Sequence, residues 1–303
     1  MASYFVLGIF TGLIYSMVAL GYTLVYGVLR LINFAHSEVL MSGGFAGYFF
    51  LRFTMHATHI STPVRVLILL GGIVASGAVG AIVAIAIERF AYRPLRRRNA
   101  PKLTYLISAI GASYFLLNLA GKEFGRDPSA TAQPITQSFS FTLWGAQITA
   151  FDLVLLGVTA VLFLVVNTLV SKSKVGRSIR AVAQDAETAS LMGVNVNTTI
   201  ASTFAIGGFM GGVAGLFIAM SSNVDYNMGF TPALLAFTAA VLGGIGNIRG
   251  AMVGGVVLGI FMYVPIYWIH QPFYEPVIGF AVLVLVLLFR PTGLFGESLG
   301  RSA

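Results

Sequence analysis

Few side chains in this sequence could do acid–base or metal chemistry. The 303 residues contain ten Asp and Glu, no Cys and four His, and the imidazoles lie too far apart for a local metal motif, with His56 and His59 forming only a weak pair. Paired carboxylates and a Ser-His-Asp order are also absent, so we expect no catalytic site and no metal site. One short stretch does combine an amide, an imidazole and a carboxylate, at Asn33, His36 and Glu38. What these three groups can do depends on the element that carries them.

The composition identifies the class of protein. Charged residues make up 9% of the chain and hydrophobic residues 57%, whereas about a quarter of a soluble domain is charged. A compact soluble protein could not cover its surface with so little charge, and the mean hydropathy of +0.88 agrees. An ordinary cytosolic enzyme, a disordered chain and a nucleic-acid-binding domain are therefore excluded. We predict an all-α fold, a bundle of membrane helices that forms a single transmembrane domain over residues 1–303.

Apolar stretches long enough to cross a bilayer, which takes roughly 20 residues, recur along the chain. Two of them are doubtful, because 38–54 is short and Gly-rich and 230–247 contains three glycines near its end. Either could be a broken or re-entrant segment that lines a cavity. The first stretch has no cation before Arg30, so we expect it to stay as a membrane helix and not to be cleaved as a signal peptide. We expect about eight spans, from candidates at 4–29, 38–54, 63–88, 103–121, 150–170, 198–221, 230–247, 250–269 and 273–290.

The placement of cations predicts the topology. Six of the 18 Lys and Arg fall in 89–102, which we take as a short loop, and four fall in 172–180. Because cytoplasmic loops gather Lys and Arg, both segments are expected on the cytoplasmic side, and this bias explains the net charge of +8 better than nucleic-acid binding does. The connection 122–149 then lies outside, where the alternating residues 137–144 predict a small β-hairpin. The N-terminus is external if the first two candidate spans both cross.

Asn33, His36 and Glu38 follow directly on the first span. A charge inside a bilayer costs about 3 kcal/mol or more on insertion scales, so its presence needs a reason. Two interpretations stay open. The three side chains line the cytoplasmic part of a path through the membrane or brace a broken helix there. Alternatively, they are interfacial residues that cap a helix beginning near Ser37, where the charge of Glu38 complements the helix dipole.

Glycines at four-residue spacing recur in the later spans. Small residues at this spacing let two helix backbones approach closely in lipid, although Gly is also simply common in membrane helices. Where the glycines share one helical face, we expect close helix packing. The two sets are Gly207, Gly211 and Gly215, and Gly250, Gly254, Gly255 and Gly259.

The cytoplasmic segment 172–196 combines charge with helical periodicity. Gly193 is suited to the position after a helix, and Asn195 or Asn197 can cap the next one, so we predict one short amphipathic helix over 175–192. That helix either lies on lipid headgroups or docks into a groove of a cytoplasmic protein. The second is favoured because its apolar stripe lacks Trp, Phe and Leu. The stripe consists of Val175, Ile179, Val182, Ala186 and Ala189.

Several motifs together resemble one family of transport proteins. Residues 183–185, followed by Ala189 and Gly193, resemble the degenerate Glu-Ala-Ala loop of bacterial ABC-importer permeases. The sequence departs from the usual pattern of this family at two positions. Ser37 lies where the family usually has Gly, and Arg249 lies where a small residue is common. The chain as a whole looks like the H-type permease subunit of LIV-type importers, which take up branched-chain amino acids. The stretches that match this signature are 12–27, 31–38, 88–95, 106–111, 236–255 and 289–293.

The resemblance implies a division of labour. The chain would pair with a paralogous M-type permease in the bacterial inner membrane, and an extracytoplasmic binding protein would deliver the amino acid. Two cytoplasmic ATPases would drive alternating access and would hold the ATP, so no cofactor is expected on this chain. A Walker A motif needs Gly-Lys followed by Ser or Thr, and the Gly121-Lys122 pair here is followed by Glu123. The residues that would couple to the ATPase are Arg177, Arg180, Ala183, Asp185, Ala189 and Gly193.

Two alternatives stay open. Related permeases of this family carry urea, short amides or other amino acids, and selectivity lies mostly in the binding protein. A stand-alone secondary transporter or channel tends to contain ionisable residues within its spans, and the predicted spans are nearly bare of them. We therefore expect a transport subunit without its own ATPase site and not an enzyme, with branched-chain or related amino acids as its cargo.

Overall fold

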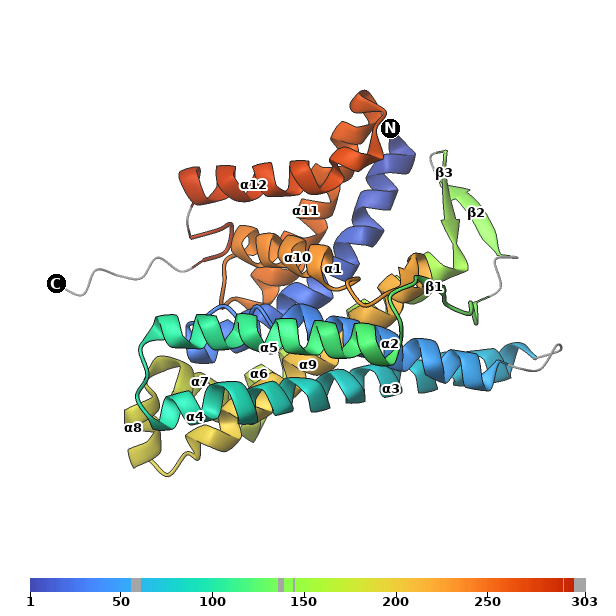
Figure 1. Cartoon of the computed structure of the whole chain (residues 1–303). Coiled ribbons are helices and arrows are strands. Elements are labelled where there is room, and N and C mark those ends of the chain that lie inside the picture. The colour runs from blue at the N-terminus through green and yellow to red at the C-terminus, as the bar shows by residue number, and fades with distance from the viewer. Residues whose placement is uncertain (56–60, 136–138, 144, 291, 297–303) are drawn as a thin grey trace.

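The computed structural model describes residues 1–55, 61–135, 139–143, 145–290 and 292–296, and within them the chain is mostly helical (Figure 1). A π-helical turn over Glu88–Tyr92 joins α3 to α4, and a 3-10 turn over Pro272–Tyr274 precedes α12. The helices are α1 (Ala2–Leu29), α2 (His36–Thr54), α3 (Thr62–Ile87), α4 (Arg93–Arg97), α5 (Lys102–Glu123), α6 (Ala150–Lys172), α7 (Lys174–Gln184), α8 (Ala186–Leu191), α9 (Val196–Ser221), α10 (Phe230–Gly243), α11 (Ile248–Ile269) and α12 (Glu275–Phe289).

Seven helical stretches in the described part of the chain are long and apolar enough to cross a membrane, and α10 is a shorter apolar helix. The predicted all-α, multi-pass membrane bundle is therefore confirmed. The two doubtful segments form α2, with 19 residues, and α10, with 14 residues. At about 1.5 Å per residue, α10 rises roughly 21 Å, which is less than the roughly 30 Å of bilayer hydrocarbon. Gly244 and Gly246, both with positive φ, end this short helix before α11 begins.

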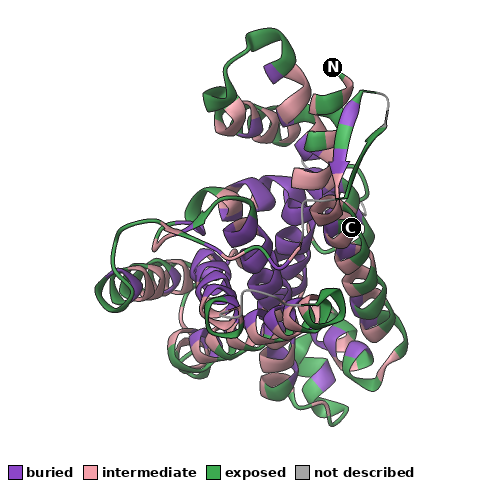
Figure 2. Cartoon of the chain, turned by 90° about the vertical axis from the view of Figure 1, so that its right-hand side faces the viewer, coloured by how far each residue is buried: buried purple, intermediate pink, exposed green. Residues whose placement is uncertain are grey.

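The core of the bundle lies around α1 and α9. α1 packs against α11 and α9, and α9 packs against α2 and α3. Most residues in the spans of α1 and α9 are buried, whereas few residues in those of α5 and α12 are. Figure 2 shows the buried residues in the middle of the bundle and the exposed residues on its outer helices. The outer helices therefore present apolar side chains to lipid or to another membrane protein.

Glycines make the closest helix crossings. A Cβ atom added at any glycine of the two predicted sets would lie against another helix or the chain end, for most of them against backbone atoms. Because neighbouring backbone cannot rotate away as a side chain can, these positions keep the helix axes close together. The contacts pair Gly207 with Gly21, Gly211 with His36, Gly215 with Leu40, Gly250 with Gly243 and Phe295, Gly254 with Ala239, Gly255 with Ser16, and Gly259 with Gly8.

In the described part of the chain, four short strands lie outside the helical bundle. β2 (Ser140–Leu143) and β3 (Ala146–Thr149) pair as an antiparallel hairpin, as the alternating residues predicted. Positions 137, 138 and 144 of that prediction, like the pair His56 and His59, lie outside the described residues. β1 (Ser129–Ala130) pairs with β4 (Asn223–Val224), which ties the long connection to the end of α9.

The structure brings the two cation-rich segments to one end of the molecule, where Figure 1 shows α4, α7 and α8 together. The expected loop at 89–102 is mostly helix, because α3 continues through the π-helical turn into α4. At this cation-rich end, Arg30 Nη2 donates to the carbonyl of Ala183 (3.4 Å). At the other end of α1, Ser3 Oγ donates to the carbonyl of Gly145 in the hairpin (3.2 Å). The N-terminus and the hairpin therefore lie at the end opposite the cations, and the positive-inside rule predicts that this end is external.

Candidate functional site

The cytoplasmic segment forms two helices and not the single one predicted. Asp185 has an extended backbone (φ −153°, ψ 113°), which ends α7 and begins α8. Its carboxylate caps α8, since Oδ1 accepts from the Glu187 N–H (2.9 Å) and Oδ2 from the Thr188 hydroxyl. Gly193 follows α8 with φ 83°, and Asn195 caps α9 through its side chain. The break therefore comes from a capping aspartate in the middle of a continuous apolar stripe.

Most of that stripe faces the chain's own bundle and not a partner. Ile179, Val182 and Ala189 are buried, and the last two belong to a hydrophobic cluster that includes residues of α1, α3 and α9. The exposed apolar side chains lie instead at the end of α8, where Leu191 is 82% exposed and Met192 is 81% exposed. The prediction that the stripe docks into another protein is therefore wrong for these three buried residues, which hold α7 and α8 against the bundle, whereas the other two members of the stripe are exposed.

The other predicted coupling residues differ in what they contact. Arg180 is exposed and donates to the carbonyls of Val170 and Ser171 at the end of α6. Ala183 is half-buried, and its carbonyl accepts the bond from Arg30. Arg177 is exposed, and its side chain forms no hydrogen bond or ion pair with the described residues. Arg180 thus fixes α7 to α6, whereas Arg177 is free to meet another molecule.

Asp185 is ionised near neutral pH. The hydrogen bond from the Thr188 hydroxyl and the bonds from the backbone N–H groups of Glu187 and Thr188 lower the pKa of this fully exposed carboxyl below its usual range. A lowered pKa means that the cap is complete above the ordinary pKa of an aspartate and weakens only as the pH falls below it. The two-helix shape of the segment is therefore independent of pH near neutrality.

Replacing Arg180 with alanine should loosen the cytoplasmic segment without unfolding the bundle. The guanidinium satisfies carbonyl groups at the C-terminal end of α6, and hydrogen bonds from a charged donor are stronger than neutral ones. We expect hydrogen–deuterium exchange of the α7 amides to rise about tenfold, with exchange in α9 unchanged. Lys172→Ala, at an exposed cation of the same segment, should leave α7 exchange as in the wild type. Equal exchange in both variants would contradict the positioning role of Arg180.

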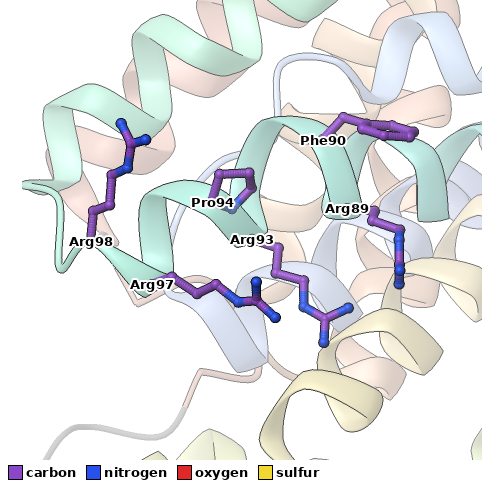
Figure 3. Close-up of a pocket in the computed structure, with 6 residues that line it drawn as sticks. All are labelled: Arg89, Phe90, Arg93, Pro94, Arg97 and Arg98. Carbon is purple, nitrogen blue, oxygen red and sulfur yellow. The ribbon is translucent and has the colours of Figure 1, made fainter.

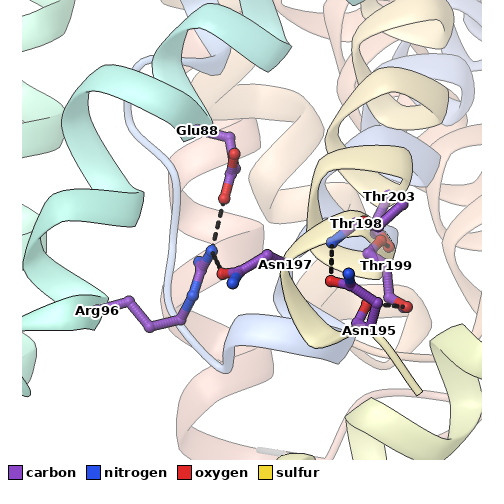
Figure 4. Close-up of polar contacts among 7 residues, drawn as sticks. All are labelled: Glu88, Arg96, Asn195, Asn197, Thr198, Thr199 and Thr203. Carbon is purple, nitrogen blue, oxygen red and sulfur yellow. Dashed lines mark hydrogen bonds and ion pairs between the residues drawn. The ribbon is translucent and has the colours of Figure 1, made fainter. Parts of the chain in front are cut away.

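A polar contact ties α4 to the start of α9 next to this segment (Figure 4). Arg96 Nη2 lies 2.7 Å from Glu88 Oε1 and donates to Asn197 Oδ1 at 2.8 Å. Asn195 Oδ1 accepts from the Thr198 N–H (3.0 Å), so Asn195, one of the two predicted caps, begins α9. The other candidate, Asn197, instead binds Arg96. These bonds hold the helices of the cation-rich end in one arrangement.

Four arginines surround a shallow pocket on the same end (Figure 3). Arg89, Arg93, Arg97 and Arg98 line a volume of about 380 Å³ beside Phe90. Phe90 is 78% exposed, which places an apolar ring next to the guanidinium groups. Cations next to an exposed apolar side chain are typical of the membrane–water interface on the cytoplasmic side. The pocket therefore has the composition expected where α3 leaves the membrane.

Asn33 and His36 are held inside the bundle. Asn33 Oδ1 accepts from the Tyr92 hydroxyl (2.9 Å) and from the Ala35 N–H (3.1 Å). The imidazole of His36 is buried, with its ring centroid 4.6 Å from that of Tyr22, and it fills the space left by the small residue Gly211. The two side chains therefore fix the start of α2 against α1, α9 and the π-helical turn.

Glu38 differs from its two neighbours because it lines a cavity. The cavity has a volume of about 270 Å³ and lies between the start of α2, α5 and the start of α10. The carboxylate accepts a hydrogen bond at Oε1 from Ser113 Oγ (2.9 Å). The Ser37 hydroxyl lies 3.0 Å from the same oxygen and 2.9 Å from the carbonyl of Phe34, so its single proton is shared between them. Asn227 lines the cavity as well, and Tyr114 lies at its exposed side. The apolar lining consists of Phe34, Ile110, Leu117 and Phe230.

Sequence reasoning missed three groups of residues at these sites. Ser113 and Asn227 lie far from Glu38 in sequence, and nothing local links them to it. Leu191 and Met192 are the large apolar residues at the end of the predicted helix, and their size next to Gly193 was the available signal. Glu88, at the end of the candidate span 63–88, is buried and paired with Arg96, and no local pattern predicts this pair.

The chain matches a family model described as branched-chain amino acid transport system / permease component over residues 4–287. It is 40% identical to the high-affinity branched-chain amino acid transport system permease protein LivH of Escherichia coli K12, covering 96% of this chain and 94% of that protein. It is 38% identical, with the same coverage, to LivH of Salmonella typhimurium and to BraD of Pseudomonas aeruginosa. No solved structure matches the chain.

These relatives cover nearly the whole chain, and their names describe membrane permeases, which are transport components and not enzymes. The helical bundle, with its multiple apolar spans and its cation-rich end, is what such a component requires. The chain is therefore a member of the family of permease components of branched-chain amino acid transport systems.

Proposed function

We propose that this chain is one of two permease subunits of a bacterial inner-membrane ABC importer for branched-chain amino acids. Its partner in the heterodimer is a paralogous M-type permease. An extracytoplasmic binding protein delivers the amino acid, and two cytoplasmic ATPases bind and hydrolyse ATP. This chain binds no cofactor of its own and contributes half of the path through the membrane.

The observation that carries this proposal is the similarity to the high-affinity permeases over 96% of the chain. The cytoplasmic end supports it with a surface suited to a partner, since α8 ends in two exposed apolar side chains and Arg177 is free. The segment is also fixed to α6 by Arg180 and to α9 by the buried stripe. A push on α8 is therefore transmitted to helices of the bundle.

Transport follows from alternating access. ATP-driven closure of the two ATPases moves the cytoplasmic segments of both permeases together and opens the path to the outside, where the loaded binding protein sits. ATP hydrolysis lets the ATPases separate, and the path opens to the cytoplasm. The tight glycine crossings of α1, α9 and α11 make the core of each permease a rigid body, so the motion takes place between the two permeases.

The test is uptake by proteoliposomes that contain this chain, the permease and ATPases encoded beside it, and the matching binding protein. We expect accumulation of radiolabelled L-leucine, L-isoleucine and L-valine that requires both ATP on the ATPase side and the binding protein. Vesicles containing this chain alone should accumulate none. Uptake by the chain alone along a proton or sodium gradient would identify a secondary transporter, and ATP-driven uptake of urea or acetamide in place of leucine would identify a related permease with another cargo.

A further inference from the structure

Glu38 lies level with the middle of an apolar helix that is long enough to span a membrane. Its hydroxyl partner Ser113 is at the centre of α5 (Lys102–Glu123), a helix that is long and apolar enough to span. A carboxylate at this depth is costly, so it needs a compensating partner. The dipole of α2 and the two serine hydroxyls offset part of that cost.

Groups within this chain stabilise the charge of Glu38 only in part. Both serine hydrogen bonds go to Oε1, and within the described part of the chain nothing donates to Oε2 and no cation pairs with this carboxylate. Glu38 is 2% exposed, yet it lines a cavity. One oxygen of a buried carboxylate is therefore left for a donor that is not part of this chain.

The cavity restricts which donor fits. Its volume of about 270 Å³ lies slightly below the roughly 300 Å³ at which pockets for drug-sized ligands begin, so a small molecule fits. Phe34 and Leu117 give it an apolar wall, which suits an aliphatic group and not a hydrated metal ion. Asn227 adds an amide whose side chain is not hydrogen-bonded to any described residue.

We propose that Glu38 binds the ammonium group of an aliphatic amino acid during its passage through the membrane. Oε2 of Glu38 accepts the charge-assisted hydrogen bond from the ammonium, and the apolar wall holds the aliphatic side chain. The Asn227 amide is the donor for the carboxylate. This inference rests on the proposed function and adds to it a site for the amino acid on the permease itself, separate from the binding protein.

The test uses protection of a single cysteine against labelling. The chain contains no cysteine, so Leu117→Cys places one thiol in the cavity wall. The complete importer is purified in detergent without its binding protein, and the rate of N-ethylmaleimide labelling of this subunit is measured by mass spectrometry. We expect protection by L-leucine and by 3-methylbutylamine, which keeps the ammonium and the branched chain. We expect none from 4-methylpentanoate, which keeps the carboxylate but lacks the ammonium.

Glu38→Gln in this background should raise the concentration of leucine that gives half-protection by about tenfold, because a hydrogen bond to a charged group is lost. Leu119→Cys, on α5 and outside the cavity lining, is the matched control and should show no protection by any ligand. Equal protection by 4-methylpentanoate, an unchanged half-protecting concentration in Glu38→Gln, or protection by sodium ions alone would overturn the proposal. The ligand series with Glu38 intact decides the question even if Glu38→Gln fails to fold.

The result of this labelling test can be distinguished from the result of the uptake test of the proposed function. ATP-driven leucine uptake by the unaltered importer tests the function and does not depend on Leu117→Cys. Intact uptake without any ligand protection overturns the Glu38 site alone. An importer that takes up no branched-chain amino acid overturns the function, and with it the cargo on which this inference rests.

Discussion

Replacing Gly215 with valine should strongly destabilise the bundle. Gly215 lies on α9 where that helix crosses α2, and an added Cβ would overlap the carbonyl oxygen of Leu40 and come within 2.9 Å of the Gly44 nitrogen. Both neighbours are backbone atoms, so the helices must move apart along the whole crossing. Overpacking of a core typically costs about 1–3 kcal/mol, and we expect the upper end here, which lowers the ratio of folded to unfolded protein about a hundredfold.

The matched control is Gly157→Val. Gly157 also lies inside an apolar helix, but a Cβ added there meets nothing within 4 Å. We expect the control to be purified in the wild-type amount with a wild-type melting temperature, and Gly215→Val to give little monodisperse protein in size-exclusion chromatography. Wild-type behaviour of Gly215→Val would mean that α2 and α9 do not cross closely.

This crossing also shows what the sequence can reveal about packing. The four-residue spacing of glycines identified the face of α9 and of α11 that approaches another helix, because small residues have few other uses inside lipid. It could not reveal which helix each face would meet. Gly215 meets Leu40 on α2, and Gly255 meets Ser16 on α1, and these pairings depend on the three-dimensional arrangement of helices that have similar apolar surfaces.

The cytoplasmic end shows a different limit of prediction from the sequence. The positive-inside rule correctly brought two cation-rich segments to one side, but it describes where cations lie and not the structure that carries them. Arg89 to Arg97 continue a helix, which agrees with the good helix propensity of arginine. In the segment that follows α6, the apolar periodicity continues through Asp185, so periodicity alone could not reveal that this residue ends one helix and caps the next.

Glu38 illustrates why a site inside a membrane is hard to predict. The sequence predicted that Asn33, His36 and Glu38 act together. In the structure Asn33 and His36 pack inside the bundle, whereas Glu38 lines a cavity. Its neighbours in the cavity come from elsewhere in the chain, Ser113 from α5 and Asn227 from the turn before α10. A single serine in an apolar span carries little information until the opposite helix is known.

The largest functional effect is expected from charging the exposed end of α8. In the double variant Leu191→Asp and Met192→Asp, two side chains that are more than 80% exposed become anionic. The bundle should fold normally, because these side chains contribute little to its core. Loss of one hot-spot side chain at the centre of a protein interface costs about 2 kcal/mol or more, so, if either of these two acts as one, binding of the ATPases should weaken at least about 30-fold. ATP-driven leucine uptake should fall with it.

A swapped variant, Leu191→Met with Met192→Leu, distinguishes the loss of an apolar contact from a general sensitivity of α8 to substitution. It keeps the apolar surface and nearly the same volume, so binding and uptake should remain as in the wild type. The affinity is measured by titrating the purified ATPase onto the permease pair in detergent, where a bilayer is absent. If the acidic variant binds the ATPase normally in detergent but loses uptake in proteoliposomes, these two side chains lie on lipid headgroups. In that case Arg177 and the rest of α7 would have to carry the coupling contact.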